Sequence, residues 1–278
     1  MKIVIVYCSP AGSTHHIAKV IYHSFNQKNV DTVMMDLAKD HNRSEALEVI
    51  KTADHKICLF IGSPVYRDMA IPPVMNFIEE LPQSERKYAV PFVTWGQACS
   101  GVALWQMGAA LMKKGYRIAG AAKVVALHSL MWLVDDPAGK GHPDKTDKRS
   151  IEEMVAILHA RFGSNDIPVL SLDSLDYQPQ ERAAEMKNKI NTPWYIIPKN
   201  VNSKVCTCCG ICEEECPIDA VALNPYPEFG LNCIDCFNCI RLCPEDAITS
   251  SVSMDDIADR IRKRVRTINE RPFTQIFL

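Results

Sequence analysis

Eight cysteines in the last third of the chain form two copies of one pattern. The first copy contains Cys206, Cys209, Cys212 and Cys216, and the second contains Cys233, Cys236, Cys239 and Cys243. In each copy two residues separate the first three cysteines, and the fourth follows after three more and is succeeded by a proline. Three thiolates in so compact a loop can converge on one iron–sulfur cubane. A zinc site would need only one pair of Cys-x2-Cys knuckles, so the two tetrads predict iron–sulfur clusters.

The fourth cysteine of each copy begins a helical turn that points away from its own triple. It therefore ligates the other cluster, as in two-cluster proteins. Cluster I is then held by Cys206, Cys209, Cys212 and Cys243, and cluster II by Cys233, Cys236, Cys239 and Cys216. The copies also agree between Pro217–Val221 and Pro244–Ile248, which indicates an internal repeat of about 27 residues. Residues 200–250 resemble the bacterial 2[4Fe–4S] ferredoxins, and Cys208, which lies outside the pattern, is interpreted as a bystander near cluster I.

Residues 1–162 alternate between apolar, β-branched runs and stretches with helical spacing. Strands are predicted at 2–7, 30–35, 56–62, 88–95 and 117–127, and helices near 17–25, 43–53, 73–81, 102–115 and 151–162. This alternation predicts an α/β domain with a doubly wound, five-stranded parallel sheet. Ligands of such sheets bind beyond the carboxyl ends of the strands. The loops at 8–14, 62–72 and 95–101 are therefore the candidate binding loops.

The first of these loops has the composition of a phosphate-binding turn. Hydroxyls occur at Ser9, Ser13 and Thr14, and Ala11 and Gly12 between them allow close approach to the backbone. The loop opens a helix, whose N-terminal amides favour an anion. It contains no Lys or Arg, and the chain has neither a Walker loop nor a G-x-G-x-x-G motif. A phosphate held by hydroxyls and amides suits a monoester such as that of FMN, and the alternative is a helix cap without a ligand.

The other two loops could meet the ring of such a cofactor. The second offers Ser63, Pro64, Val65 and Tyr66, and the third offers Trp95, Gly96, Gln97 and Gly101. A tyrosine at a strand tip can lie against a flat ring, although a half-buried surface aromatic is the alternative. The two glycines expose backbone amides that could bond the edge of a flavin. Cys99 is interpreted as a small packing residue, and Cys8 and Cys58 as inert core.

These loops together resemble the flavodoxin superfamily. The whole chain is similar to the flavodoxin–ferredoxin fusion proteins of anaerobes known as EFR1-type ferredoxins. The motifs that match are Tyr7–Thr14, Gly62–Tyr66 and the two cysteine tetrads. The resemblance implies a flavodoxin-like sheet with strand order 2-1-3-4-5, bound FMN, and a small α+β ferredoxin-like domain. Trp95 and Gln97 depart from the small and polar residues expected after strand four.

The expected domains are therefore a flavodoxin-like FMN-binding domain at 1–162, a linker at 163–200, a 2[4Fe–4S] ferredoxin domain at 201–250, and a closing helix and tail at 251–278. His128 and Trp132 lie beyond the fifth strand, where they could face the flavin, the ferredoxin domain or the core. The apolar run Trp194–Ile197 in the linker is expected to dock and to hold the two domains together.

Charge and hydropathy limit the partners. The net charge is −2, which gives no indication of nucleic-acid binding, and residues 201–250 carry eight acidic against two basic side chains. No run of about eighteen apolar residues occurs, so no membrane span is expected. Without a signal-peptide pattern, a cytoplasmic location is expected, where twelve cysteines indicate metal binding rather than disulfides. Redox proteins are the expected partners, and a homodimer is left open.

We therefore expect a chain that passes electrons between two [4Fe–4S] clusters and FMN. No side chain needs to act as nucleophile or base in such a protein, so no catalytic residue is predicted. Two alternatives stay open at this point. One is an FMN-dependent reductase of a quinone or another small oxidant, fed through the clusters. The other is a tethered ferredoxin whose first domain lacks flavin and serves for docking.

Overall fold

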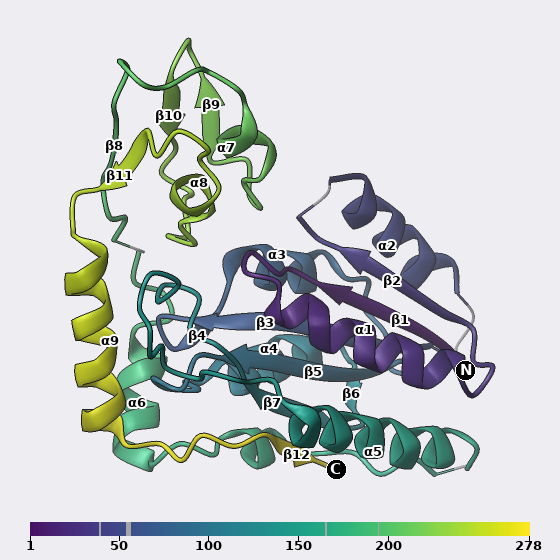
Figure 1. The fold of residues 1–278 in the computed structure, drawn as a ribbon. Coiled ribbons are helices and arrows are strands. Elements are labelled where there is room, and N and C mark those ends of the chain that lie inside the picture. Colours follow the sequence, from purple (N-terminus) through teal and green to yellow (C-terminus); the bar gives the residue numbers. More distant parts are fainter. Residues whose placement is uncertain (39, 54–56, 165, 194) are drawn as a thin grey trace.

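Five parallel strands in the order β2-β1-β3-β5-β7 form the centre of the molecule (Figure 1). They are β1 (Lys2–Tyr7), β2 (Thr32–Asp36), β3 (Ile57–Tyr66), β5 (Tyr88–Trp95) and β7 (Ala121–Val125). The computed structural model describes residues 1–278 except 39, 54–56, 165 and 194. Numbered along the parallel sheet alone, this order is 2-1-3-4-5, so the expected flavodoxin-like fold is confirmed.

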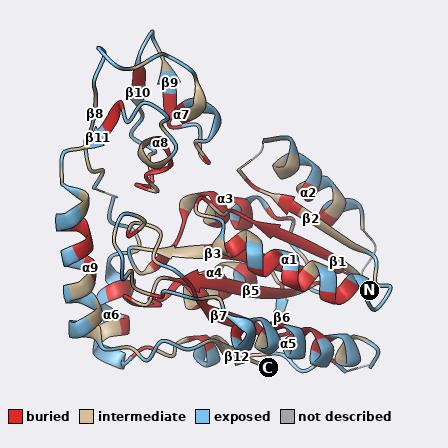
Figure 2. Ribbon diagram, in the orientation of Figure 1, coloured by how far each residue is buried: buried red, intermediate tan, exposed pale blue. Residues whose placement is uncertain are grey.

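Helices cover both faces of this sheet. They are α1 (Ser13–Asn26), α2 (Asp40–Thr52), α3 (Pro72–Glu80), α4 (Ala103–Lys113) and α5 (Lys145–Phe162). Alternate residues of one strand belong to different cores: Ile3 and Ile5 pack with α1 and α5, whereas Val4 and Val6 pack with α3 and α4. The central strands are therefore buried on both faces, as Figure 2 shows, and this explains their continuous apolar sequences.

Several predicted boundaries differ from the observed ones. Strand two begins at Thr32 rather than at 30, and predicted strand five is divided into β6 (Arg117–Ile118) and β7. Helix α5 begins at Lys145, six residues before the predicted 151. The cause is a capping box, in which the side chains of Asp144 and Asp147 bond each other's backbone N–H groups. Lys56, predicted to begin strand three, lies outside the described residues.

The cysteine-rich segment contains two small antiparallel ribbons and two short helices. They are β8 (Lys199–Val201) with β11 (Ile248–Ser250), β9 (Val221–Leu223) with β10 (Pro227–Phe229), α7 (Ile211–Glu214) and α8 (Asn238–Arg241). The internal repeat is visible in the backbone: Cys208 and Asp235 occupy equivalent positions, with φ of 54° and 52°. In Figure 1 this segment lies above the end of the sheet at which the loops were predicted to bind a ligand.

The remaining segments connect this cysteine-rich module, residues 199–250, to the sheet domain. Between the two lie η1 (Leu172–Leu175) and α6 (Gln180–Asn188), and β4 (Met69–Ala70) forms a short ribbon with β3. After the module, α9 (Met254–Ile268) leads back, and β12 (Gln275–Phe277) pairs antiparallel with β7 (Figure 1). No pattern in the sequence predicted that the end of the chain joins the main sheet. No helix among the described residues is long and apolar enough to cross a membrane.

Candidate functional site

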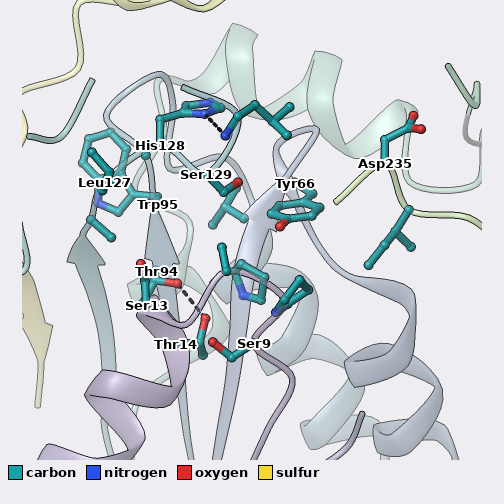
Figure 3. A pocket seen from close by; sticks show the side chains of 18 of the residues that line it. Ser9, Ser13, Thr14, Tyr66, Thr94, Trp95, Leu127, His128, Ser129 and Asp235 are labelled. Atoms are coloured by element: carbon teal, nitrogen blue, oxygen red, sulfur yellow. Dashed lines mark hydrogen bonds between the residues drawn. The ribbon is translucent and has the colours of Figure 1, made fainter. Parts of the chain in front are cut away.

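A cavity of about 250 Å³ opens at the carboxyl ends of β1, β3, β5 and β7, and we call it the strand-end cavity (Figure 3). All three predicted loops contribute to its wall. The predicted residues that line it are Ser9, Ala11, Ser13, Thr14, Pro64, Val65, Tyr66, Trp95 and Gly96. This is the position at which doubly wound sheets hold ligands, because the ends of neighbouring parallel strands leave a crevice there.

The first loop leaves backbone donors unused at the start of α1. The Ser9 Oγ accepts the N–H of His15 at 2.9 Å, and the Thr14 and Thr94 hydroxyls bond each other at 2.7 Å (Figure 3). Ser9 therefore also serves the capping role that the sequence left as an alternative. The N–H groups of Ala11, Ser13 and Thr14 make no hydrogen bond with the residues that the structure describes. Three unpaired N–H groups at a helix N-terminus suit an anion such as a phosphate monoester.

Gly12 gives this loop its shape. It is the N-cap residue of α1 and has φ of 88°, in the left-handed region that other residues rarely adopt. A Cβ at this position would meet no atom within 4 Å, so the constraint is conformational and not steric. Gly12 itself is not part of the cavity wall, but its conformation sets the turn between Ala11 and Ser13, which both line the cavity.

Two aromatic side chains of the wall carry buried polar atoms without partners. The Tyr66 Oη and the Trp95 Nε1 are both inaccessible to solvent, and neither has a hydrogen-bond partner within the described part of the chain. The Ser129 hydroxyl lies near Tyr66, but it does not reach hydrogen-bonding geometry. Since these polar atoms are themselves inaccessible, Tyr66 and Trp95 line the cavity with their other atoms. A flat, largely apolar ring such as that of a flavin fits this wall.

His128 forms the roof of the cavity above Gly96. Its Nδ1 accepts the N–H of Leu130 at 3.3 Å, so the proton of the neutral ring lies on Nε2 (Figure 3). A Cβ on Gly96 would come within 2.7 Å of this ring and 2.8 Å of the His128 backbone. Gly96 therefore contributes by its lack of a side chain, which allows the His128 loop to close over strand β5.

The burial of His128 predicts a pH-dependent stability. Burial lowers its pKa from 6.5 to about 4. Between these values the unfolded chain binds a proton that the folded chain does not, so stability falls as the pH is lowered from 6.5 to 4. We expect a loss of roughly 2 kcal/mol in this window, reduced from the full linkage value because the side chain is partly exposed.

Denaturant unfolding at pH 6.5 and at pH 4 measures this loss. His128→Asn should remove most of it. The control His159→Asn changes an exposed histidine on α5 and should keep it. Equal pH dependence in His128→Asn and wild type would contradict the assignment to His128.

Besides Gly12, three predicted residues lie outside the wall, where they support the loops. The buried Ser63 hydroxyl accepts the N–H of Ile71 at 3.0 Å and donates to the Pro64 carbonyl at 2.8 Å. The Gln97 Oε1 accepts the N–H of Gly139 at 2.5 Å. Gly101 packs against the backbone of Asp68. Trp132 is likewise absent from the wall and packs in an apolar cluster with Met131 and Ile257.

Three of the four cysteines outside the tetrads, Cys8, Cys58 and Cys99, lie in the sheet domain and are buried. Burial raises the pKa of the Cys58 thiol, and burial together with the nearby Asp36 carboxylate raises that of Cys8. Burial and the Asp68 carboxylate raise the pKa of Cys99 to about 12. None of them is a nucleophile at neutral pH, because the thiolate is the reactive form.

Residues from the rest of the chain complete the cavity. The lining includes Ile197 from the linker, Ile234 and Asp235 from the second cysteine loop, and Ile261 from α9. Ile197 belongs to the run expected to dock; Tyr195 in the same run is 71% exposed, and Trp194 lies outside the described residues. The sequence indicated an apolar face on α9, but nothing in it related that face to the loops of the sheet domain.

The predicted cluster ligands gather around two further cavities. The outer cysteine cavity is lined by Cys206, Cys209, Cys212 and Cys243, together with Cys208. The inner cysteine cavity is lined by Cys216, Cys233, Cys236 and Cys239, with Cys212 between the two. The fourth cysteine of each copy thus lies with the triple of the other copy, as the pairing rule requires.

The spacing of the sulfur atoms bears on which metal group fits. Four sulfurs around one zinc ion would lie about 3.8 Å apart, from a Zn–S distance of 2.3 Å. Within the described residues, the one group of three ligand atoms lying within 4.8 Å of one another is His142, Asp144 and Asp147. The cysteines therefore surround a wider space than a single ion fills, which fits a cubane. Backbone N–H groups approach the sulfurs, as from Ala220 to Cys216 at 3.1 Å and from Ala247 to Cys243 at 3.3 Å.

The module and the sheet domain share direct contacts at the strand-end cavity. The Arg241 guanidinium on α8 donates to the carbonyl of Pro10 in the first loop at 3.1 Å. The Arg67 guanidinium donates to the Asp235 carboxylate at 2.7 Å. Phe237 of the module is fully buried with Ile257 and Ile261 of α9. The second cysteine loop is therefore fixed over the cavity by polar and apolar contacts together.

No protein-family model and no curated protein sequence matches this chain. Similar folds occur among solved structures. One is the rubredoxin oxygen:oxidoreductase of Desulfovibrio gigas, with 20% identity and a TM-score of 0.47 over 58% of this chain and 36% of that one. Another is a flavodoxin from the domain Archaea, with 18% identity and a TM-score of 0.42 over 59% of this chain and 100% of that one. A third is the Flv1 flavodiiron core of Synechocystis sp. PCC6803, with 15% identity and a TM-score of 0.47 over 60% of this chain and 37% of that one. This chain spans about a third of the length of the first and third proteins.

Proposed function

We propose that this chain is an electron-transfer iron–sulfur flavoprotein, with FMN in the strand-end cavity and [4Fe–4S] clusters in the two cysteine cavities. A flavin exchanges one or two electrons and each cluster exchanges one, so the bound groups would supply conversion between the two kinds of electron transfer. The observation that carries the proposal is that the second cysteine loop also forms part of the wall of the strand-end cavity. Ile234 and Asp235 lie between the predicted ligands Cys233 and Cys236, and both residues also line the strand-end cavity.

Different residues of the strand-end cavity would bind different parts of the cofactor. The unpaired N–H groups of Ala11, Ser13 and Thr14 would bind the phosphate. Tyr66 and Trp95 would contact the ring. Ile197, Ile234 and Ile261 would exclude water from the side that faces the module. The hydrogen bond from Arg241 to the Pro10 carbonyl would hold the first loop at a fixed position relative to the second cysteine loop.

The two cysteine cavities differ in their access to solvent, and this difference suggests the order in which electrons would pass through them. Cys236 packs against the main core of the sheet domain, whereas Cys208 and Cys209 beside the outer cavity are exposed. The outer cavity would therefore exchange electrons with a redox protein partner, and the inner cavity with the strand-end cavity. The exposed acidic residues Glu213, Glu214 and Glu245 near the outer cavity favour a partner with a basic surface.

The two alternatives receive less support. A reductase of a quinone or another small oxidant would need free access over the ring, but module residues cover that side, and Trp132 does not line the cavity. A flavin-free docking domain would leave three amides of the first loop unpaired. The electron-transfer function is therefore preferred.

The test begins with the flavin released by acid from anaerobically purified protein. We expect about one FMN per chain, with reduction of that flavin when a low-potential donor reduces the iron–sulfur clusters. A chain that holds no flavin even after incubation with FMN would reduce residues 1–162 to a docking domain. Bound FMN that stays oxidised beside reduced clusters would overturn electron transfer between them. Faster reoxidation of the flavin by quinones than by buffer alone would favour the reductase.

A further inference from the structure

The inner cysteine cavity has a buried cation in its wall. Lys199 is the one charged side chain, cysteines aside, among the described residues that line it, and its side chain is 1% exposed. The Lys199 Nζ donates to the Cys233 Sγ at 3.4 Å. It also lies 5.1 Å from the ring centre of Phe237. A buried ammonium group is unusual, because its removal from water costs several kcal/mol unless partners compensate it.

A chain of ionic contacts holds this cation in place from the sheet domain. The Lys199 Nζ bonds the Asp235 Oδ1 at 2.8 Å and the Ile197 carbonyl at 3.1 Å. The other Asp235 oxygen accepts from Arg67 at 2.7 Å. Asp235 is 7% exposed, so its ion pair with Lys199 is largely shielded from solvent, whereas Arg67 is 34% exposed. Since Arg67 lines the strand-end cavity, the wall of that cavity fixes the position of Lys199.

The outer cavity lacks this arrangement, although the module is an internal repeat. Cys208 takes the place of Asp235 in the first copy, with nearly the same left-handed backbone. The residue one repeat after Lys199 is Tyr226, which is exposed, and the ionisable residue that lines the outer cavity besides the cysteines is Glu245. The inner half therefore places both the Lys199 ammonium group and the Asp235 carboxylate beside the Cys233 sulfur, the carboxylate at 3.9 Å, whereas the outer half places the Glu245 carboxylate beside its ligands.

We infer that Lys199 is a positioning and tuning residue that raises the reduction potential of the inner cluster above that of the outer one. The inference rests on the proposed function. Reduction adds one electron, and hence one negative charge, to a cluster and its thiolates. An ammonium group that donates to a ligand sulfur stabilises this added charge, and hydrogen bonds to the sulfurs and net charge are known to set such potentials. Electrons entering at the exposed outer cluster would then move energetically downhill toward the strand-end cavity.

The test is a redox titration of the full chain with dithionite, followed by electron paramagnetic resonance, in wild type and Lys199→Met. We expect the potential of one cluster to fall by at least the equivalent of a tenfold change in its oxidised-to-reduced ratio, or about 59 mV for one electron. The other cluster should change little. Lys204→Met is the matched control, because it removes the same charge from an exposed position of the module. Lys204→Met should shift the reduction potentials of both clusters slightly and by similar amounts.

Further variants separate a loss of structure from a loss of charge. Lys199→Arg keeps the charge and should restore a potential close to that of wild type. Lys199→Gln keeps a neutral donor and should still lower the potential, and it replaces the methionine variant if that variant loses iron. Suppose that the protein contains the proposed FMN and iron. Equal shifts of the cluster potentials in Lys199→Met and Lys204→Met, or no shift in either, would then overturn the inference but not the proposed function. Wild-type protein without iron would instead overturn the proposed function and the inference with it.

Discussion

Replacing Cys216 with alanine is expected to leave the chain with about half of its iron. Cys216 lies in the first copy of the cysteine pattern but lines the inner cavity with Cys233, Cys236 and Cys239. Removal of one of four thiolates should release the cluster that they share, whereas the outer cavity keeps its full set of ligands. Iron and acid-labile sulfide per chain measure this loss, and electron paramagnetic resonance of the reduced protein shows which signal disappears.

Two further variants make the comparison specific. Cys243→Ala should remove the other cluster and the other signal, because Cys243 lines the outer cavity. Cys208→Ala should retain the iron of both clusters, since Cys208 is exposed and lies outside the repeated pattern. Loss of the same signal in Cys216→Ala and Cys243→Ala would contradict the crossed ligand sets. Loss of iron in Cys208→Ala would show that this residue, and not a neighbour, is a ligand.

The sheet domain followed from the sequence because its signals are local and strong. Each buried strand is a short run of β-branched residues, as in Lys2–Tyr7, and each following helix has apolar residues at helical spacing. Errors occurred where a weaker signal decides the boundary. The capping box of Asp144 and Asp147 consists of two aspartates three residues apart in a polar segment, and it extends α5 by nearly two turns beyond its apolar face.

The site was only half predictable, for a different reason. The loops of Ser9–Thr14 and Ser63–Tyr66 were found because a parallel sheet brings consecutive strand ends together. Asp235 and Ile261 were not, because no sequence rule states how two separately folded segments dock. Lys199 likewise has no motif around it, and its importance arises from burial next to Cys233. Such contacts depend on the relative placement of the module, which the linker and the closing helix determine together.

That placement depends on the end of the chain. After α9, Glu270 enters a largely buried polar network in the sheet domain, with its side chain 11% exposed. Its carboxylate lies 2.8 Å from the Nζ of Lys123, which is 4% exposed, and accepts the N–H of Ser100 at 2.9 Å. Lys123 also lies 5.4 Å from the ring centre of Trp95, which lines the strand-end cavity. Together with the pairing of β12 and β7, this network anchors the returning chain.

Glu270→Ala should therefore destabilise the protein by about 3 kcal/mol, because it leaves the buried Lys123 ammonium without its counter-charge. Thermal unfolding followed by circular dichroism should show a midpoint several degrees lower. Glu152→Ala is the matched control, since Glu152 forms an exposed i,i+4 pair with Lys148 on α5. Such a pair contributes less than about 1 kcal/mol, so the control should unfold close to wild type.

The pH dependence provides an independent check on the same pair. Burial would raise the pKa of Glu270, but Lys123 and the hydrogen bonds from Ser100 outweigh it and hold the pKa below its ordinary value of 4.5. The folded chain therefore keeps Glu270 ionised where the unfolded chain protonates it, and wild type loses this stabilisation as the pH falls below 4.5. Glu270→Ala has none to lose, so the gap between variant and wild type should narrow in acid. A gap that stays constant would mean that the variant acts through lost packing of β12 and not through the buried charge of Lys123.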